Sequence, residues 1–282
     1  MSEALRPDEV AAPMRVRWSG MTHPGKVRKN NEDSFLALTF NRETFHYLGK
    51  TGETSLEEHD LVFAVSDGMG GANAGEFASK IAVEKITRLL PKAFLSRAAG
   101  IQPGFTDLFE LVYMEIHRAL TYLGESYPEC QGMGSTLTLT WLTPGWLYFA
   151  HLGDSRLYYL AANGDFKQLS EDHSHVGWLR RHGKINEREA RDHPGRSSLQ
   201  KALGAGHQFV DPQVGAVGLE PGDQFLLCTD GLVDGLWDRN IKGLLRDPDE
   251  REASQDPALR LVRKAVDVSG RDNTTALVME IL

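Results

Sequence analysis

The sequence predicts an α+β protein in which antiparallel sheets are covered by helices. Short apolar segments recur along the 282-residue chain, and turns such as Asn163-Gly164-Asp165 join several of them, as in β-hairpins. Two longer segments carry apolar residues at three- and four-residue spacing, which is typical of amphipathic helices. The hydrophobic content of 41% and the charged content of 25% are ordinary for a globular protein. Adjacent hairpins combined with paired long helices favour sheets with helical cover.

The N-terminal part is expected to contain a polar leader followed by two strands. Residues 1–13 lack the basic-then-apolar order of a signal peptide, so we expect a flexible leader there. Residues 14–20 alternate apolar and polar side chains, which predicts a half-buried strand. Residues 34–40 form a second strand candidate. Residues 41–60 are polar and are interpreted as a surface excursion between strands.

Two long helices are predicted next, and both apolar stripes are interpreted as core packing. The first helix should span residues 75–90, with Pro91 as its stop. Its apolar positions are Phe77, Ile81, Ile86 and Leu89. The second helix has a more regular stripe at four-residue intervals, formed by Leu108, Val112, Ile116 and Leu120.

The second half of the chain alternates predicted strands with short helices. Strands are expected at 135–142, 146–152, 156–160, 166–169, 198–202, 209–217, 224–230 and 274–281. Residues 171–194 are rich in His, Arg and Glu and should form one or two short surface helices. Helices are also predicted at 238–246 and 257–268.

Charge and cysteine content exclude some classes of protein. The net charge of −8 argues against a nonspecific nucleic-acid or anionic-membrane surface. No run of 18 apolar residues occurs, so no transmembrane helix is expected. The two cysteines, Cys130 and Cys228, give no disulfide framework, which fits a reducing cytoplasm. Cys228 lies inside an apolar strand and is predicted to be a buried thiol.

Acidic motifs at the ends of apolar segments indicate the functional site. Residues 61–66 lead into Asp67-Gly68, and residues 225–229 lead into Asp230-Gly231. Carboxylates near apolar strands are costly unless neutralised, and hard divalent cations prefer oxygen ligands. The sequence therefore predicts a carboxylate metal centre. The other acidic motifs are Arg28-Lys29-Asn30-Asn31-Glu32-Asp33, Gly153-Asp154-Ser155-Arg156 and Arg271-Asp272-Asn273. If these meet at one site, the two chain ends interleave, which favours a single domain over residues 14–282.

Other phosphate chemistries fit the sequence poorly. Residues 20–27 nearly match a phosphate-binding P-loop, but Val27 stands where a Ser or Thr would bind magnesium. Neither cysteine has an arginine six residues downstream, and no Gly-x-Ser-x-Gly motif occurs. The chain thus offers no convincing protein nucleophile.

Taken together and in order, the motifs resemble the metal-dependent protein phosphatase family, type 2C, in its bacterial form. The resemblance spans about residues 16–281 and rests on the acidic motifs above, with Gly70-Gly71 and Gly75-Glu76 following Asp67-Gly68. It implies a four-layer αββα sandwich of two antiparallel sheets flanked by helix pairs, with metals in a cleft at one end. Residues 173–194 correspond to the mobile flap of bacterial members, which helps to choose substrates.

The resemblance also implies a binuclear Mn²⁺ or Mg²⁺ centre. Asp67 would bridge the two ions. Glu32 and the carbonyl of Gly68 would bind one of them, while Asp230 and Asp272 would bind the other. A third, weaker ion is possible. The counterpart of Asp154 helps to hold such an ion in some members, with Asp230 shared.

Two residues have implied roles beyond metal binding. Asp33 would orient metal-bound water, and Arg28 would grip the substrate phosphate with two hydrogen bonds. The simpler alternatives are that Asp33 is a structural hydrogen-bond acceptor and that Arg28 is a surface charge or pairs with a local carboxylate. Asp154 could likewise belong to an ordinary tight turn. Asn273 is expected to shape a turn rather than touch substrate.

No histidine is predicted to be a metal ligand, and the sequence departs from the family pattern at two places. His151, His173, His175 and His193 are interpreted as surface or core residues. Met69 stands where eukaryotic relatives have a histidine proposed as general acid, a feature that bacterial relatives share. Thr22-His23-Pro24 stands where relatives often carry an acidic residue.

The implied activity is hydrolysis of phosphoserine and phosphothreonine in proteins by a metal-activated water. No covalent phosphoenzyme forms in this reaction. The implied partners are phosphorylated proteins, substrates of a bacterial serine/threonine kinase, and the enzyme is expected to be a cytoplasmic monomer. The alternative is a phosphatase-like pseudoenzyme that senses or binds phosphoproteins. The complete set of Glu32, Asp67, Asp230 and Asp272 argues against it.

Overall fold

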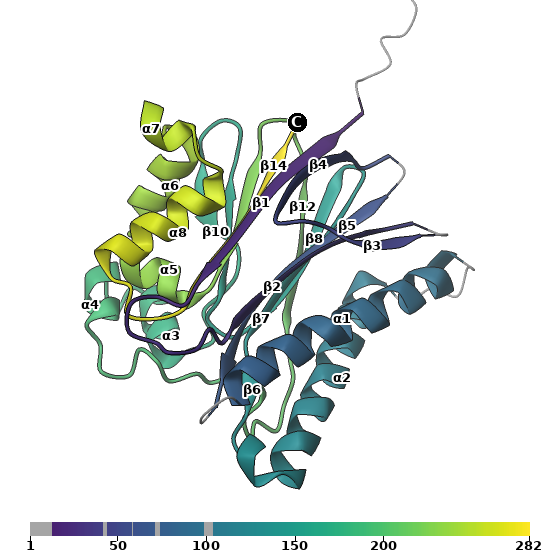
Figure 1. Cartoon of the computed structure of the whole chain (residues 1–282), viewed down its shortest axis with the longest axis vertical. Coiled ribbons are helices and arrows are strands. Elements are labelled where there is room, and N and C mark those ends of the chain that lie inside the picture. The colour runs from purple at the N-terminus through teal and green to yellow at the C-terminus, as the bar shows by residue number, and fades with distance from the viewer. Residues whose placement is uncertain (1–12, 42–43, 58, 71–73, 99–103) are drawn as a thin grey trace, which may run out of the picture.

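Two β-sheets pack face to face, and helices cover the outer face of each sheet (Figure 1). The computed structural model describes residues 13–41, 44–57, 59–70, 74–98 and 104–282. The predicted leader over residues 1–13 lies outside this range except for its last residue. Among the described residues, no helix has both the length and the apolar character needed to cross a membrane.

Within the described ranges, the first sheet has six strands in the order β10-β9-β13-β14-β1-β4, and all its pairings are antiparallel. Its strands are β1 (Arg15–His23), β4 (Thr51–Ser55), β9 (Arg156–Leu160), β10 (Phe166–Gln168), β13 (Gln224–Cys228) and β14 (Thr274–Ile281). β1 pairs with β14 from Val16 opposite Ile281 to His23 opposite Thr274. The first and last strands are therefore neighbours, as the scattered acidic motifs require.

In the described part of the chain, the second sheet has eight antiparallel strands and is centred on β5. Its strands are β2 (Asp33–Phe40), β3 (Phe45–Tyr47), β5 (Asp60–Met69), β6 (Gly134–Ser135), β7 (Leu137–Thr143), β8 (Trp146–Leu152), β11 (Leu203–Gly204) and β12 (Gln213–Gly218). β5 pairs with β2, β6 and β7. Its residues 61–65 have no exposed surface, because both faces of this strand are covered.

Helices form the two outer layers, on opposite sides of the sheets in Figure 1. Helices α1 (Ala74–Ala98) and α2 (Phe105–Ser126) cover the eight-stranded sheet, and α5 (Asp230–Gly235), α6 (Asp238–Arg246) and α8 (Pro257–Val268) cover the six-stranded sheet. The short helices are η1 (Pro128–Cys130), α3 (His175–Arg181), α4 (Glu187–Arg191) and α7 (Glu250–Ala253). Three buried apolar clusters separate the layers: helix on sheet, sheet on sheet, and sheet on helix. The predicted four-layer αββα sandwich is confirmed.

Helix α2 follows its sequence pattern closely. All four predicted stripe residues are buried, and each full burial of such a side chain is worth about 1.5–3 kcal/mol. The Tyr113 hydroxyl, also buried, lies 3.0 Å from the carbonyl oxygen of Leu137 and 2.7 Å from that of Ala150. Apolar packing and this polar contact together fix α2 on β7 and β8.

Helix α1 differs from its prediction in both stripe and length. Phe77 is 57% exposed, and the helix is buried through Ala74, Ala78, Ala82 and Ile86. Small side chains on the inner face let this helix approach the sheet closely. Because alanine is only weakly hydrophobic, this buried face does not stand out in the sequence. The helix also continues past Pro91, because a proline removes one backbone hydrogen bond without having to end a helix.

Other corrections concern short elements. Residues 41–60 contain β3 and β4 rather than only a surface excursion. β4 is a polar edge strand beneath Trp18, where a Cβ on Gly52 would lie 2.2 Å from the indole ring. Residues 198–202 are not a strand; Leu199 makes only an isolated bridge to Ser174. Helices α5 and α7 were not predicted, since each is no longer than six residues.

Candidate metal centre

The predicted carboxylates come from both sheets and meet at one end of the sandwich. Asp33 and Asp67 are direct partners in the register of β2 and β5. Asp230 begins α5 directly after β13, and Asp272 lies in the turn before β14. The Thr229 amide donates to the Thr275 carbonyl at 3.1 Å, which holds these two strand ends together. The topology therefore joins motifs that are far apart in sequence.

Asp33 connects the two sheets. Its Oδ2 accepts hydrogen bonds from the hydroxyls of Thr229 at 2.8 Å and Thr275 at 2.7 Å. Its Oδ1 is buried and has no hydrogen-bond partner among the described residues. A buried carboxylate oxygen is costly to leave unpaired. This oxygen is thus suited to a water molecule or a cation in the centre.

The backbone of Asp67 is held on both sides. Its amide donates to the Thr136 hydroxyl at 3.0 Å, and its carbonyl accepts from the Thr136 amide and the Ser135 hydroxyl, both at 2.8 Å. These contacts fix the end of β5 and so the direction in which the Asp67 carboxylate leaves it.

Glu32 and the carbonyl of Gly68 form a small cradle beside the start of α1. A Cβ on Gly75 would lie 2.7 Å from Glu32 Oε1 and 2.9 Å from the Gly68 carbonyl oxygen. The Gly68 amide also donates to the Glu32 carbonyl at 3.1 Å. Two oxygen atoms thus converge where only glycine leaves room, an arrangement that fits a hard cation.

The carboxylates raise one another's pKa values. Burial, followed by the charges of Asp33 and Asp230, raises the pKa of Asp67 well above its usual range. Burial and the charges of Asp154 and Asp272 do the same for Asp230. Across the described residues, no three His, Cys or carboxylate side chains converge closely enough to hold an ion in the present geometry. The donor set, all oxygen and strongly anionic, nevertheless fits Mn²⁺ or Mg²⁺, since such cations offset this repulsion.

Comparison with known proteins decides the family. The profile of a family described as protein phosphatase 2C matches residues 50–264. The chain belongs to the protein phosphatase 2C family.

Relatives of this 2C-family protein include bacterial phosphatases. Serine/threonine protein phosphatase PstP of Mycobacterium tuberculosis is 32% identical over 269 residues, which is 95% of this chain and 45% of PstP. The chain therefore spans less than half the length of that relative. Serine/threonine phosphatase stp of Listeria monocytogenes is 31% identical over 92% of this chain and 93% of stp.

A solved structure gives the same result. The catalytic domain of PstP in complex with two manganese ions matches with a TM-score of 0.72 and 30% identity, over 95% of this chain and 99% of that one. The two-sheet fold of this 2C-family protein is therefore shared with a protein that binds two manganese ions.

In this member of the 2C family, Arg28 pairs with one of the predicted metal ligands. Its Nη2 donates to Asp272 Oδ2 at 2.8 Å, and the Arg28 side chain is 52% exposed. The hydrogen bond and the charge of Asp272 raise the pKa of the guanidinium. The ion pair between Arg28 and a neighbouring carboxylate, one of the alternatives for Arg28, is thus present. It places the guanidinium at the edge of the carboxylate cluster.

Asn273 shapes the neighbouring turns, as predicted. Its Oδ1 accepts from the Glu32 amide at 2.8 Å, and its Nδ2 donates to the carbonyls of Pro24 and Asn30. This side chain holds the Glu32 segment against the Asp272 segment.

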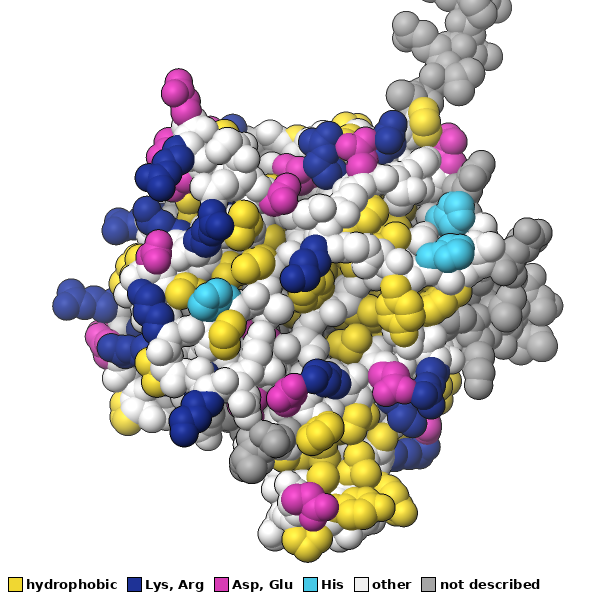
Figure 2. Space-filling model, viewed as in Figure 1, with side chains coloured by type: hydrophobic (Ala, Val, Ile, Leu, Met, Phe, Trp, Pro, Cys, Tyr) yellow, Lys and Arg dark blue, Asp and Glu magenta, His cyan; other side chains and the backbone are white. Residues whose placement is uncertain are grey.

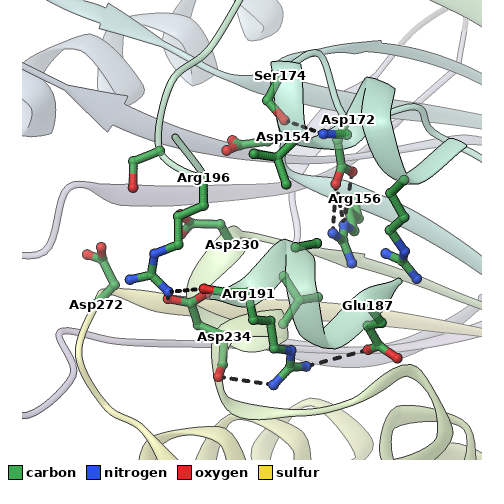
Figure 3. Close-up of a pocket in the computed structure, with 16 residues that line it drawn as sticks. Asp154, Arg156, Asp172, Ser174, Glu187, Arg191, Arg196, Asp230, Asp234 and Asp272 are labelled. Atoms are coloured by element: carbon green, nitrogen blue, oxygen red, sulfur yellow. Dashed lines mark hydrogen bonds and ion pairs between the residues drawn. The ribbon is translucent and has the colours of Figure 1, made fainter. Parts of the chain in front are cut away.

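A pocket beside the carboxylates is partly walled by the predicted flap. Asp154, Asp230 and Asp272 line it together with residues of α3 and α4; in Figure 3, Asp272 and Glu187 lie on opposite sides. Arg191 of α4 lies over the Trp237 ring at 3.7 Å from its centroid. In this 2C-family chain the flap segment therefore rests on the turn between α5 and α6.

A buried ion pair anchors the start of the flap segment. Arg156 donates from Nη2 to Asp172 Oδ2 at 2.7 Å and from Nη1 to the Tyr158 hydroxyl at 2.8 Å. Burial raises the pKa of Asp172, but the charge and hydrogen bond of Arg156 outweigh it, so the net direction is downward. Breaking such a buried pair leaves an uncompensated charge.

Sequence reasoning missed the hydroxyl groups that hold the carboxylates. The sequences around Thr136, Thr229 and Thr275 are ordinary strand sequences. Only Thr229 is distinguished, because it lies directly before the acidic motif at Asp230. Arg156 was part of a recognised motif but had no assigned role. These roles depend on pairings between strands that are distant in sequence.

The stability of the metal-free protein should depend on the ionisation of Asp33. Burial, partly offset by the hydroxyls of Thr275 and Thr229, raises the pKa of Asp33 from 3.8 to about 7. The folded state then binds more protons than the unfolded state between these pH values. The resulting stability is fully present below the unfolded pKa and is lost as pH rises through the folded pKa.

Asp33→Asn should therefore flatten the decrease in melting temperature between about pH 4 and about pH 7 in EDTA. Asp165→Asn, at an exposed turn, is the matched control and should follow wild type. Thermal unfolding curves for the three proteins would test this. Parallel profiles of melting temperature against pH for Asp33→Asn and wild type would contradict the raised pKa of Asp33.

Proposed function

We propose that this protein hydrolyses phosphoserine and phosphothreonine in proteins, and that residues 14–282 form one phosphatase catalytic domain. The proposal is carried by the complete carboxylate set, which two sheets bring to one end of the fold. Asp33 and Asp67 face each other across β2 and β5, and Asp230 follows β13. The family membership and the names of the relatives support the same activity.

The metal ligands are proposed as follows. Asp67 would serve both Mn²⁺ or Mg²⁺ ions, Glu32 and the Gly68 carbonyl would serve one, and Asp230 and Asp272 would serve the other. Asp154 would belong to a weaker third site. When bound, such ions lower the pKa of water and withdraw charge from phosphoryl oxygens.

The chain's own groups orient the reactants. Oδ1 of Asp33, which has no partner in the described part of the chain, can accept a hydrogen bond from the attacking water, while Oδ2 stays bound to two threonine hydroxyls. A cysteine nucleophile at Cys228 is disfavoured. The buried Cys228 thiol has its pKa raised by desolvation, so it is not the nucleophile.

Arg28 would hold the substrate phosphate. Arg28→Ala should raise KM for a phosphothreonine peptide and lower kcat/KM roughly tenfold to a hundredfold, since a charge-assisted bidentate contact is worth about 1.5–3 kcal/mol. Mn²⁺ affinity should stay within a few-fold of wild type, because a guanidinium donates no lone pair to a metal. Steady-state kinetics and calorimetric Mn²⁺ titration measure the two effects separately.

Two control variants sharpen this test. Arg28→Lys should recover only part of the loss, because a point charge cannot reproduce the two-pronged contact. Arg118→Ala removes a surface arginine of α2 that pairs with Glu115, and it should leave kinetics unchanged. An Arg28→Ala enzyme with wild-type kcat/KM would leave Arg28 as no more than the partner of Asp272.

Turnover of phosphopeptides tests the function itself. With Mn²⁺ present, the protein should release phosphate repeatedly from phosphoserine and phosphothreonine peptides and much more slowly from a matched phosphotyrosine peptide. Binding of these peptides without release of phosphate would support the pseudoenzyme instead.

The proposed setting is the bacterial cytoplasm, with substrates of a serine/threonine kinase as partners and a monomeric enzyme. Both cysteines are free thiols, which suits a reducing compartment. On the face shown in Figure 2, basic side chains are interspersed with acidic ones rather than gathered in a stripe, which disfavours nucleic acid as a partner. Light scattering at working concentration would test the monomeric state.

A further inference from the structure

Two stacked histidines contact Gly153, the residue that precedes Asp154. The rings of His151, at the end of β8, and His173, just before α3, have centroids 5.0 Å apart and an interplanar angle of 26°. Neither belongs to the proposed metal ligands. Asp172 and Ser174, the neighbours of His173, line the same pocket as Asp154 (Figure 3).

The contacts of His151 fix its tautomer. Its Nε2 lies 3.1 Å from the carbonyl oxygens of both Gly153 and Glu171, so this nitrogen must carry the proton. Its Nδ1 then accepts from the Thr138 hydroxyl at 2.9 Å. Burial lowers the pKa of His151 to about 4, which keeps the ring neutral near pH 7. The carbonyl of Gly153 is thereby hydrogen-bonded to the His151 ring at the end of β8.

His173 binds Gly153 twice. Its Nδ1 accepts from the Gly153 amide at 3.1 Å, and its own amide donates to the Gly153 carbonyl at 2.7 Å. Gly153 has a φ of +117°, and a Cβ there would lie 2.6 Å from Thr136 Cβ. This turn is therefore open only to glycine, and both of its polar groups are tied to histidines.

The other side of Asp154 is also fixed. The Ser155 hydroxyl lies 2.8 Å from the Thr136 hydroxyl, which also accepts from the Asp67 amide. Asp154 thus stands between two anchored residues, one of which is tied to Asp67. Its carboxylate acts electrostatically on Asp67 and on Asp230, where it is the largest of the charge effects.

We propose that His173, supported by His151, is a positioning residue for Asp154: it holds the Gly153 turn so that the Asp154 carboxylate stays in the wall of the pocket that Asp230 also lines. The inference rests on the proposed metal-dependent function, in which Asp154 serves the weaker site. His173 also begins the flap segment, and its carbonyl accepts from the Gln200 amide at 2.8 Å. The same residue therefore joins the start of the flap, and the segment that follows the flap, to the Asp154 turn.

Two substitutions of similar size test the contact. Asparagine places its amide oxygen near the position of Nδ1, whereas glutamine reaches the position of Nε2. In the metal-free protein, His173→Gln should speed hydrogen exchange of the Gly153 amide about tenfold, the effect of losing one hydrogen bond. His173→Asn should keep exchange near wild type. Equal exchange in both variants would overturn the proposed contact, and this result needs no turnover.

A double-mutant cycle tests whether the contact acts through Asp154. In wild-type background, His173→Gln should weaken the weakest Mn²⁺ binding step, measured by calorimetry, about tenfold to a hundredfold. In an Asp154→Asn background the same change should have little further effect, because the carboxylate it positions is gone. Additive effects, or no effect of His173→Gln on Mn²⁺ binding, would overturn the inference. A protein that binds Mn²⁺ as expected but releases no phosphate would instead contradict the proposed function.

Discussion

Asp230→Asn should reduce phosphate release from a phosphothreonine peptide at least about a hundredfold while leaving the protein folded, because stabilisation of the transition state by the metals is worth several kcal/mol. The amide keeps the shape of the side chain but removes one negative charge from a cluster in which Asp154 and Asp272 act on Asp230. Loss of that repulsion should also raise the melting temperature of the metal-free protein. Activity and metal-free stability are thus expected to change in opposite directions.

Asp272→Asn should cause a comparable loss of turnover. It differs from Asp230→Asn in stability, since it also weakens the ion pair with Arg28. Calorimetric titration with Mn²⁺ should show weakened binding in both variants, with residual affinity from Asp67 and Glu32. The exposed Asp165→Asn control should bind Mn²⁺ and turn over peptide like wild type. Unchanged stoichiometry and affinity in both site variants would mean that neither residue is a ligand.

The features that could be predicted from sequence are those set by local periodicity. The stripe of α2 and the strands at 146–152, 156–160 and 274–281 have the predicted positions because apolar side chains alone determine them. The acidic motifs were also recognisable, since an Asp-Gly pair follows each of two apolar segments, although Asp67-Gly68 still belong to β5 and Asp230-Gly231 begin α5.

The features that could not be predicted depend on partners far away in sequence. The inner face of α1 is built from Ala78 and Ala82, whose burial depends on how closely a sheet approaches them. The bond between Asp33 and Thr275 spans 242 positions, and no local pattern indicates it. The pairing of Arg28 with Asp272 was only one alternative for that arginine, because the choice depends on which turns the two sheets bring together.

Removal of divalent cations should abolish turnover completely. The donor set is made of carboxylate and carbonyl oxygens, and it contains no cysteine cluster that would retain zinc against a chelator. Burial raises the pKa of Cys228, which makes that thiol a poor ligand. Turnover should return on addition of Mn²⁺ or Mg²⁺, because the chain keeps all its ligands after the ions are removed.

This fold is expected to assemble a carboxylate centre for metal-dependent phosphate release. The most direct test of this expectation is phosphate release from a phosphothreonine peptide, measured in parallel with Mn²⁺, with Mg²⁺ and after exhaustive EDTA treatment. We predict sustained turnover with at least one of the two cations and none after chelation, with recovery when the cation is restored. Full turnover in EDTA would contradict the claim.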